Sequence, residues 1–282
     1  MPLNLPDRLP AIELLKKENI FVIDSSRASS QDIRPLRIVI LNLMPLKITT
    51  ETDLVRLLSN TPLQVEVSFM KVKGHTSKNT PVEHMKAFYR DFELMKEEKF
   101  DGMIITGAPV EHLDYEEVNY WDEIKEIFDW ARTHVTSTLY ICWAAQAGLY
   151  HYYGVPKYKL DRKMFGVFKQ YPLVPMLPIF RGFDDEFYMP HSRHTEIRRE
   201  DVLRVPGLEV IAESPQSGVC PLYLGYGIPS RFGERLADRH AGELLLSQCA
   251  GGRTVGDMAC SWKPVVFQLA ELLRVSGNSL RY

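Results

Sequence analysis

The chain has 282 residues, of which 45% are hydrophobic, and a formal net charge of −2. A chain of this size buries a substantial core, as one large α/β domain or two smaller ones. Lysine and arginine are spread along the sequence without a basic stripe, which argues against nucleic acid as a partner. The first residues lack a secretory-signal pattern, and no apolar run approaches the roughly 18 residues that cross a bilayer. Four cysteines without paired spacing favour a reducing compartment. We therefore expect a cytoplasmic protein with no membrane partner.

Apolar runs and helical patterns alternate through the first half of the chain. The expected strands are residues 36–44, 63–70, 100–105 and 137–141, followed later by 164–168, 186–189 and 208–213. The expected helices are residues 10–19, a segment capped by Thr49 or Thr50, and residues 81–98, 120–134 and 144–153. This order predicts a doubly wound, mostly parallel sheet with helices on both faces.

Cys142 lies at the joint between the strand 137–141 and the helix 144–153. A thiol in this position faces the N–H groups and the positive dipole end of the helix, and both favour the thiolate. It also lies at the carboxyl edge of the sheet, where α/β folds bind their ligands. The alternative is a small buried hydrophobic residue, as most cysteines are. Position alone leaves both interpretations open.

Five segments of the sequence, one of which contains Cys142, match the pattern of a known family in the same order. They are residues 38–45, 104–111, 140–151, 163–168 and 191–196. Together they resemble the homoserine O-acyltransferases of methionine biosynthesis, a branch related to the class I glutamine amidotransferases. The resemblance implies a flavodoxin-like fold of the class I glutamine amidotransferase type. It also implies acetyl-CoA and L-homoserine as substrates, no cofactor beyond acetyl-CoA as co-substrate, and a homodimer.

The resemblance makes Cys142 the expected nucleophile. Its thiolate attacks the thioester of the acyl-CoA, and the hydroxyl of homoserine then takes the acyl group from the cysteine. Each step passes through an oxyanion, which backbone N–H groups stabilise by about 3–4 kcal/mol per donor. We expect the N–H of Trp143 and one from Leu43 or Met44 to be these donors.

The resemblance also implies residues that select the substrates. Lys163 and Ser192 match positions that contact substrate, and Arg193 offers a bidentate fork for the carboxylate of homoserine. Without the resemblance, Lys163 belongs to a charged, solvated cluster at 161–163. Glu111 matches a position where Glu resembles users of acetyl-CoA and Gly resembles users of succinyl-CoA. A carboxylate there fills the acyl pocket and repels the distal carboxylate of succinate, so we expect acetyl transfer, with succinyl transfer as the alternative.

His191 and His194 flank Ser192 and Arg193. Two histidines three residues apart ligate a metal or act as a base in some sites. On a strand, however, such residues point to opposite faces, and no cysteine or carboxylate spacing accompanies them. We therefore expect no metal here and a scaffolding role at the substrate site. The remaining histidines of the first half are expected to be ordinary surface or loop residues: His75, His84, His112 and His134.

The family pattern stops at Val219. The family carries its base and orienting acid in a Gly-His-x-Glu strand end, but the matching positions here hold Arg235 and Ala237. Three of the four cysteines follow Val219, whereas Lys263 is the single lysine that does. We therefore predict an acyltransferase domain at residues 1–219 and a segment at 220–282 that does not match the family. We hypothesise that a shifted reading frame produced this segment.

The tail contains His240 and Glu243, which could be a displaced catalytic pair. They lie in a stretch that predicts a helix at 236–246, where residues three apart share a face, so we expect a solvated pair instead. A second, amphipathic helix is predicted at 264–274. Because the base of the family is absent, an alternative function is binding of acyl-CoA or homoserine without turnover. A further alternative is glutamine amidotransfer, because Cys142 and Gln146 are similar to the nucleophile motif of that family, although Ala144 replaces its glycine.

Overall fold

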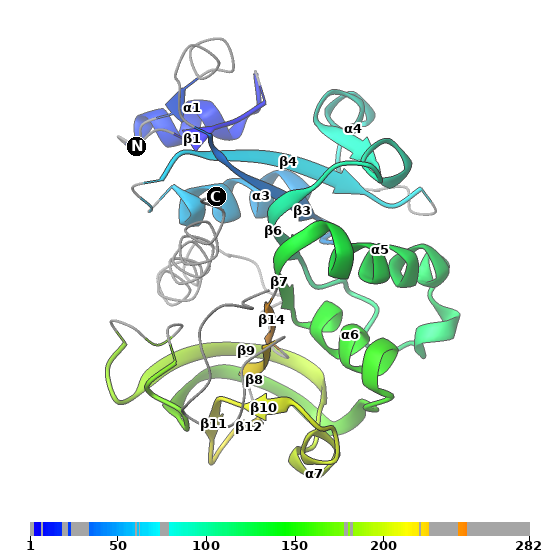
Figure 1. Ribbon diagram of the computed structural model, residues 1–282, viewed down its shortest axis with the longest axis vertical. Coiled ribbons are helices and arrows are strands. Elements are labelled where there is room, and N and C mark those ends of the chain that lie inside the picture. The colour runs from blue at the N-terminus through cyan, green and yellow to red at the C-terminus, as the bar shows by residue number, and fades with distance from the viewer. Residues whose placement is uncertain are drawn as a thin grey trace, which may run out of the picture.

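A mostly parallel sheet forms the centre of the molecule, and a smaller antiparallel sheet lies at one end of it (Figure 1). The computed structural model describes residues 3–6, 8–18, 22–23, 34–59, 61, 63–73, 79–177, 180, 183–219, 221–225 and 242–246. The large sheet has the order β10-β13-β14-β7-β6-β3-β4-β1-β2, with β5 paired to β4. The small sheet has the order β12-β11-β8-β9.

The strands of the large sheet are β1 (Leu3–Asn4), β2 (Val22–Ile23), β3 (Leu36–Leu41), β4 (Val65–Lys71), β5 (Tyr89–Asp91), β6 (Phe100–Ile105), β7 (Val135–Ile141), β10 (Leu208–Val210), β13 (Pro221–Gly225) and β14 (Gly242–Leu246). Those of the small sheet are β8 (Tyr158–Pro172), β9 (Phe187–Glu196), β11 (Ala212–Ser214) and β12 (Gly218–Val219). The α-helices are α1 (Ala11–Lys17), α3 (Lys47–Leu58), α4 (Val82–Phe88), α5 (Trp121–His134), α6 (Trp143–Tyr153) and α7 (Arg199–Leu203).

The large sheet is covered on both faces. β3 pairs in parallel with β4 and β6, and β7 pairs in parallel with β6 and β14. Successive residues of β3 enter different cores: Val39 and Leu41 pack with α5 and α6, whereas Ile38 and Ile40 pack with α3. Figure 1 shows α3 on the opposite side of the sheet from α5 and α6. The doubly wound fold predicted from the alternation of elements is therefore confirmed.

One predicted helix is wrong over much of its length. The pattern at 81–98 favoured a continuous helix, but α4 ends at Phe88 and the next three residues form β5 beside β4. A short 3-10 helix follows at Phe92–Leu94. Tyr89 leaves the helical course because its ring is buried in the α3 core and its hydroxyl hydrogen-bonds Glu51 on α3, a partner that a local pattern does not reveal.

The start of α3 also differs from the prediction. The helix begins at Lys47, with Leu46 at the N-cap, so neither Thr49 nor Thr50 caps it. The hydroxyl of Thr50 instead donates back to the carbonyl of Leu46, 3.1 Å away, inside the first turn. A threonine within a helix makes this bond readily, which is why its presence did not mark the boundary.

The helix predicted at 236–246 is wrong where the structure describes it. Residues 242–246 form β14, parallel to β7, with Glu243 opposite Thr138. The apolar run Leu244–Leu246 suits a strand inside a parallel sheet as well as it suits a helix, and length alone could not separate the two. His240, Arg235, Ala237 and the helix predicted at 264–274 lie outside the described residues.

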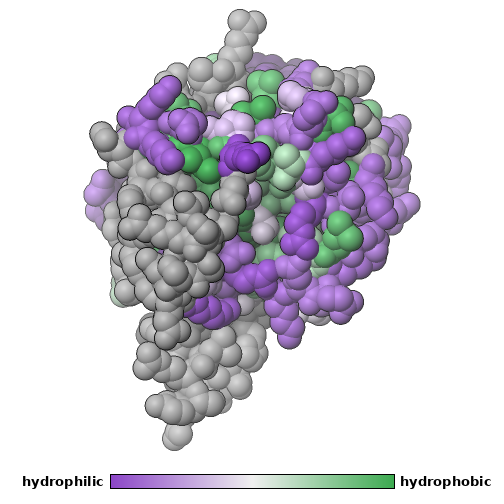
Figure 2. Space-filling view, turned by 90° about the horizontal axis from the view of Figure 1, so that it is seen from above, coloured by the Kyte–Doolittle hydropathy of each residue, from purple (hydrophilic) through white to green (hydrophobic). Residues whose placement is uncertain are grey.

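Within the described ranges, no helix is both long enough and apolar enough to cross a membrane. Figure 2 shows the molecule from above, where hydrophobic residues reach the surface in separate areas between hydrophilic ones.

Candidate functional site

Cys142 occupies a sharp turn between β7 and α6. Its backbone has φ 58° and ψ −119°, a conformation that side chains rarely adopt, and it stands at the N-cap of α6. The carbonyl of Cys142 accepts hydrogen bonds from the N–H groups of Ala145 and Gln146, at 3.1 and 3.2 Å. A strained backbone of this kind costs roughly 1–3 kcal/mol and is typical of functional positions. The turn fixes the half-buried thiol at the carboxyl edge of the sheet, as the sequence predicted.

Gly107 packs directly against this cysteine. A Cβ atom added at Gly107 would lie 3.0 Å from Cβ and 3.4 Å from Sγ of Cys142. Contacts this short are rare between real side chains, so any larger residue at position 107 would push the loop after β6 away from the thiol. The loop at residues 106–109, part of the segment 104–111 that matches the family, is therefore one wall of the site.

The turn after β3 holds the second expected oxyanion donor. The N–H of Leu43 donates to Oγ1 of Thr106 at 2.8 Å, so this donor is already engaged. The N–H of Met44 donates to Oδ1 of Asn42 over a longer 3.2 Å. Trp143, as the first residue of α6, contributes one of the N–H groups that have no acceptor within a helix. Leu43 and Met44 were the two residues expected to supply an oxyanion donor. The longer hydrogen bond of the Met44 N–H is the easier one to replace by a bond to an oxyanion.

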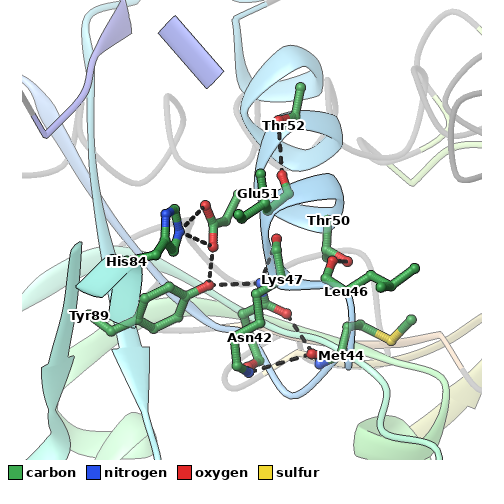
Figure 3. Close-up of polar contacts among 10 residues, drawn as sticks. Asn42, Met44, Leu46, Lys47, Thr50, Glu51, Thr52, His84 and Tyr89 are labelled. Atoms are coloured by element: carbon green, nitrogen blue, oxygen red, sulfur yellow. Dashed lines mark hydrogen bonds and ion pairs between the residues drawn. The ribbon is translucent and has the colours of Figure 1, made fainter. Parts of the chain in front are cut away.

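A buried polar network lies beneath this turn, centred on the carboxylate of Glu51 (Figure 3). Oε1 of Glu51 accepts from the hydroxyl of Tyr89 at 2.6 Å, and Oε2 lies 2.9 Å from Nε2 of His84. Nδ2 of Asn42 donates to the Tyr89 hydroxyl at 2.9 Å and so connects the network to the turn. We call these four residues the Glu51 network. Burial, reinforced by the carboxylate, raises the pKa of Tyr89 far above its usual range.

Lys47 extends the Glu51 network to the main chain of the turn. Its ammonium donates to the carbonyls of Asn42 and Met44 while its side chain is buried. Burial lowers the pKa of Lys47 to about 8, and the opposing attraction of Glu51 does not restore it. Lys47 therefore fixes residues 42–44 with a cation that is still protonated at neutral pH.

The Glu51 network was missed by the sequence prediction. His84 was expected to be a surface or loop residue, but only 6% of it is exposed and it pairs with Glu51. A signal did exist: Glu51 lies four and seven residues before Val55 and Leu58, on the stripe of α3 that faces the core. An acid on such a stripe needs buried donors, although their identity depends on contacts distant in sequence.

Glu111 is held by two other parts of the chain. Its Oε2 accepts a hydrogen bond from the backbone N–H of His194 at 2.9 Å. The ammonium of Lys157 donates to the carbonyls of Glu111 and Leu113, at 3.0 and 2.5 Å. Burial lowers the pKa of Lys157, against the attraction of nearby acids. The structure thus places Glu111 beside β9, the strand that carries Ser192.

Lys163 and Ser192 belong to the two strands of the β8–β9 hairpin. Ser192 is directly opposite Phe165, and residues paired in this way share a face. Lys163 falls where the register of the hairpin shifts, between Lys159 and Met164, and its Nζ lies 5.7 Å from the Phe165 ring centroid. Ser192 is buried, whereas Lys163 is exposed. The expected contact of both residues with substrate stays a prediction.

Arg193 is engaged by the protein itself rather than open to a substrate carboxylate. Its Nη1 donates to the carbonyl of Thr195 at 3.1 Å and its Nη2 to the carbonyl of Ser217 at 2.6 Å. His191 points to the same face, 3.3 Å from Nε2 of Gln170, which also donates to Ser217. Burial, with a further contribution from the charge of Arg193, lowers the pKa of His191 to about 3. We call Arg193, Thr195, Ser217, Gln170 and His191 together the Arg193 network.

β9 is also attached to the helix that follows the cysteine. The hydroxyl of Thr195 donates to Oε1 of Gln146 on α6 at 2.8 Å, and both groups are buried. Gln146 lies one helical turn after Cys142. β9 is therefore positioned relative to the thiol by this bond at one end and by the Arg193 network along its length.

Comparisons with known proteins identify the family and the fold of the chain. A sequence model of the family described as homoserine O-succinyltransferase matches residues 2–224. The chain belongs to the homoserine O-succinyltransferase family. This acyltransferase is 80% identical over 219 residues to the homoserine O-acetyltransferase of Bacteroides fragilis strain YCH46, covering 78% of the chain and 72% of that relative. It is 58% identical to that of Acetivibrio thermocellus, again over 78% of the chain and 72% of the relative.

Solved structures share the fold of this acyltransferase. A protein from Thermoplasma acidophilum, described as a component of GMP synthase, superposes with a TM-score of 0.54 at 15% identity, covering 86% of this chain and 98% of that one. The glutaminase domain of Trypanosoma brucei CTPS gives 0.51 at 12% identity, covering 85% and 94%. The fold is therefore of the class I glutamine amidotransferase type, as predicted. Identities this low establish the architecture alone.

Proposed function

We propose that the chain transfers an acetyl group from acetyl-CoA to the hydroxyl of L-homoserine, a step of methionine biosynthesis, through acetyl-Cys142. The observation that carries the proposal is the strained turn at Cys142, which holds the thiol at the N-terminus of α6 and against Gly107. The names of the relatives, homoserine O-acetyltransferase, support the same reaction.

In the first step, the Cys142 thiolate adds to the thioester carbonyl of acetyl-CoA. The tetrahedral oxyanion would accept hydrogen bonds from the N–H of Trp143 and, once it leaves Asn42, from that of Met44. The carbon–sulfur bond to CoA then breaks, CoA leaves as a thiol after taking a proton, and an acetyl thioester remains on Cys142. In the second step, the hydroxyl of homoserine attacks this thioester, gives up its proton, and releases the cysteine.

The choice of acetyl over succinyl rests on Glu111. Its side chain is fixed by the N–H of His194 and its main chain by Lys157, so its position is defined. A fixed carboxylate repels the distal carboxylate of a succinyl group while leaving space for a methyl group. Lys163 and Ser192 are proposed to contact homoserine; in support, the Nζ of Lys163 lies near the ring of Phe165, the residue that pairs with Ser192.

A second candidate is binding without turnover. The positions at which the family has its base and orienting acid carry Arg235 and Ala237. His191 does not replace that base, because it is buried and the guanidinium of Arg193 is beside it. Loss of the base slows such chemistry by orders of magnitude.

We also propose that residues 220–282 derive from a shifted reading frame. Translating the coding DNA in its other two frames tests this directly: absence of Gly-His-x-Glu from both would refute it.

Intact-protein mass spectrometry separates the candidates. Incubation with acetyl-CoA is expected to add one acetyl group to the chain but none to Cys142→Ala. If L-homoserine then removes the acetyl group and releases O-acetylhomoserine, the transferase proposal holds; a persistent acetyl adduct supports binding with a single acylation. Ammonia released from glutamine, without acetylation, would instead support the amidotransferase alternative.

The donor preference has its own test. Glu111→Gly is expected to raise the rate of acylation by succinyl-CoA relative to acetyl-CoA, whereas Glu116→Gly, in the 3-10 helix Tyr115–Glu117 that follows this loop, leaves the ratio unchanged. An unchanged ratio in Glu111→Gly would remove the support for Glu111 as the residue that selects the donor.

A further inference from the structure

Three side chains that offer metal-binding atoms converge beside the proposed acyl pocket. Glu111 and His112 come from the loop after β6, and His194 comes from β9, 83 residues after Glu111. One ligand atom from each lies within 4.8 Å of the other two. The two imidazole rings are close, with centroids 4.4 Å apart and planes inclined by 52°.

The ligand atoms are available as well as close. Among the described residues, no hydrogen bond engages Oε1 of Glu111 or a ring nitrogen of His112 or His194, whereas Oε2 of Glu111 accepts the backbone N–H of His194. A hydrogen bond to one oxygen of a carboxylate fixes the direction of the other oxygen. In known metal sites, outer partners orient the ligands through hydrogen bonds of this kind. Lys157 fixes the main chain on both sides of His112 by its bonds to the carbonyls of residues 111 and 113.

We propose that Glu111, His112 and His194 bind a divalent transition-metal ion of the Zn²⁺ type. Two imidazole nitrogens and one carboxylate oxygen form a ligand set that Zn²⁺ uses in sites with an open fourth position. His112 is exposed, which gives an ion a path from solvent and leaves room for water as the fourth ligand. The prediction of no metal considered only the spacing of His191 and His194, and that spacing does not include the two ligands supplied by the loop.

A bound ion would reach the acyl pocket through Glu111. Coordination of Oε1 neutralises the carboxylate and fills the space beside it, so the metal is expected to inhibit acylation. This consequence rests on the proposed function, because it assumes that Glu111 lines the acyl pocket. The binding of the metal does not depend on that assumption.

Titration with Co²⁺ followed by visible absorption tests the site without activity. One ion per chain is expected to produce the d–d absorption of a site of low coordination number, and Zn²⁺ should displace it. His112→Ala and His194→Ala are each expected to lower the association constant by more than about tenfold, since even outer partners of ligands cost tenfold or more. His134→Ala, which removes a histidine at the end of α5, should leave it unchanged.

Cys142→Ala serves as the second control, because a thiolate is itself a metal ligand. Binding kept in Cys142→Ala and weakened in both histidine variants upholds the proposal. Binding lost in Cys142→Ala, or unchanged in His112→Ala, whose exposed side chain can be removed without disturbing the fold, overturns it. Metal binding without inhibition of acylation would uphold the metal site and overturn its connection to the acyl pocket.

Discussion

Two buried polar networks support the surroundings of Cys142, and they are built on opposite charges. The Glu51 network centres on a carboxylate that accepts hydrogen bonds, and it holds the turn after β3. The Arg193 network centres on a guanidinium that donates to main-chain carbonyls, and it holds β9. Each contains a buried histidine, but His84 has a carboxylate partner whereas His191 lies beside a cation.

This difference shows how the environment decides what a buried histidine contributes. His191 is kept neutral because burial and Arg193 both oppose a positive charge. In the Glu51 network, the charge that must be satisfied is the anion, and three side chains from separate elements supply its surroundings: Lys47, His84 and Tyr89. Substitutions and changes of pH should therefore lower the free energy of unfolding differently in the two networks.

The largest effect is expected from Glu51→Leu. The substitution removes the acceptor and leaves the Tyr89 hydroxyl, His84 and the cation of Lys47 buried without it. Breaking a buried ionic network in this way typically costs about 3–5 kcal/mol, to be measured as the free energy of unfolding in urea. Glu83→Leu, on the exposed side of α4, is the matched control and should change stability by less than about 0.5 kcal/mol. Equal losses in both variants would show that the Glu51 network contributes nothing.

The next largest effect is a pH dependence caused by His191. The folded-state pKa of His191 is about 3, below the ordinary value of 6.5. Between these two values the unfolded chain binds a proton that the folded chain does not, so stability is full above pH 6.5 and falls as the pH falls. At pH 4.5 this single group should cost about 2–3 kcal/mol relative to pH 7.

The measurement is the free energy of unfolding of the wild type and of His191→Gln at both pH values. The wild type should lose more stability on acidification than the variant, by the amount given above. Parallel losses in the two proteins would mean that His191 does not titrate on unfolding as inferred.

A smaller loss is expected from Tyr89→Phe. The ring stays, but Glu51 loses its 2.6 Å hydrogen bond and Asn42 loses an acceptor. Hydrogen bonds to a charged group contribute about 2 kcal/mol, so the free energy of unfolding should fall by roughly that amount. When Tyr89→Phe is made in the Glu51→Gln variant, it should lower the free energy of unfolding by less, because the charged acceptor is absent. If the losses of the two single variants simply add in the double variant, the assigned contact is contradicted.

The smallest effect is expected from Thr195→Val, which removes the bond from β9 to Gln146 while keeping the shape of the side chain. A loss of about 1 kcal/mol is expected from chemical denaturation. Because this bond positions β9 relative to α6, the KM for homoserine should rise more than kcat falls. Unchanged kinetics with the expected loss of stability would limit the bond to a structural role.

The sequence predicted the features that depend on local pattern. Alternating strands and helices were enough for the doubly wound sheet, and the joint at Cys142 was enough for the turn. Two of the failures come from contact between segments distant in sequence. Tyr89 leaves its helix for Glu51, and residues 242–246 pair with β7 although their pattern also favours a helix.

The candidate site divides in the same way. Cys142 and Glu111 were predicted from motifs, and their roles stay predictions, whereas Gly107 at the thiol and the carboxylate of Glu51 gave only weak local signals. Arg193 was expected to bind a substrate carboxylate, because a fork-shaped donor suits one. Main-chain carbonyls satisfy the same fork, and no one-dimensional pattern distinguishes the two acceptors.

At position 142, the backbone conformation favours one residue for folding stability and another for the proposed chemistry. Glycine adopts φ 58° without strain, so a library at this position sorted only for folding should enrich glycine. Sorting the same library for the acyl transfer proposed above should return cysteine alone. Opposite winners from the two screens would identify position 142 as a residue retained for its reactivity at a cost to the fold.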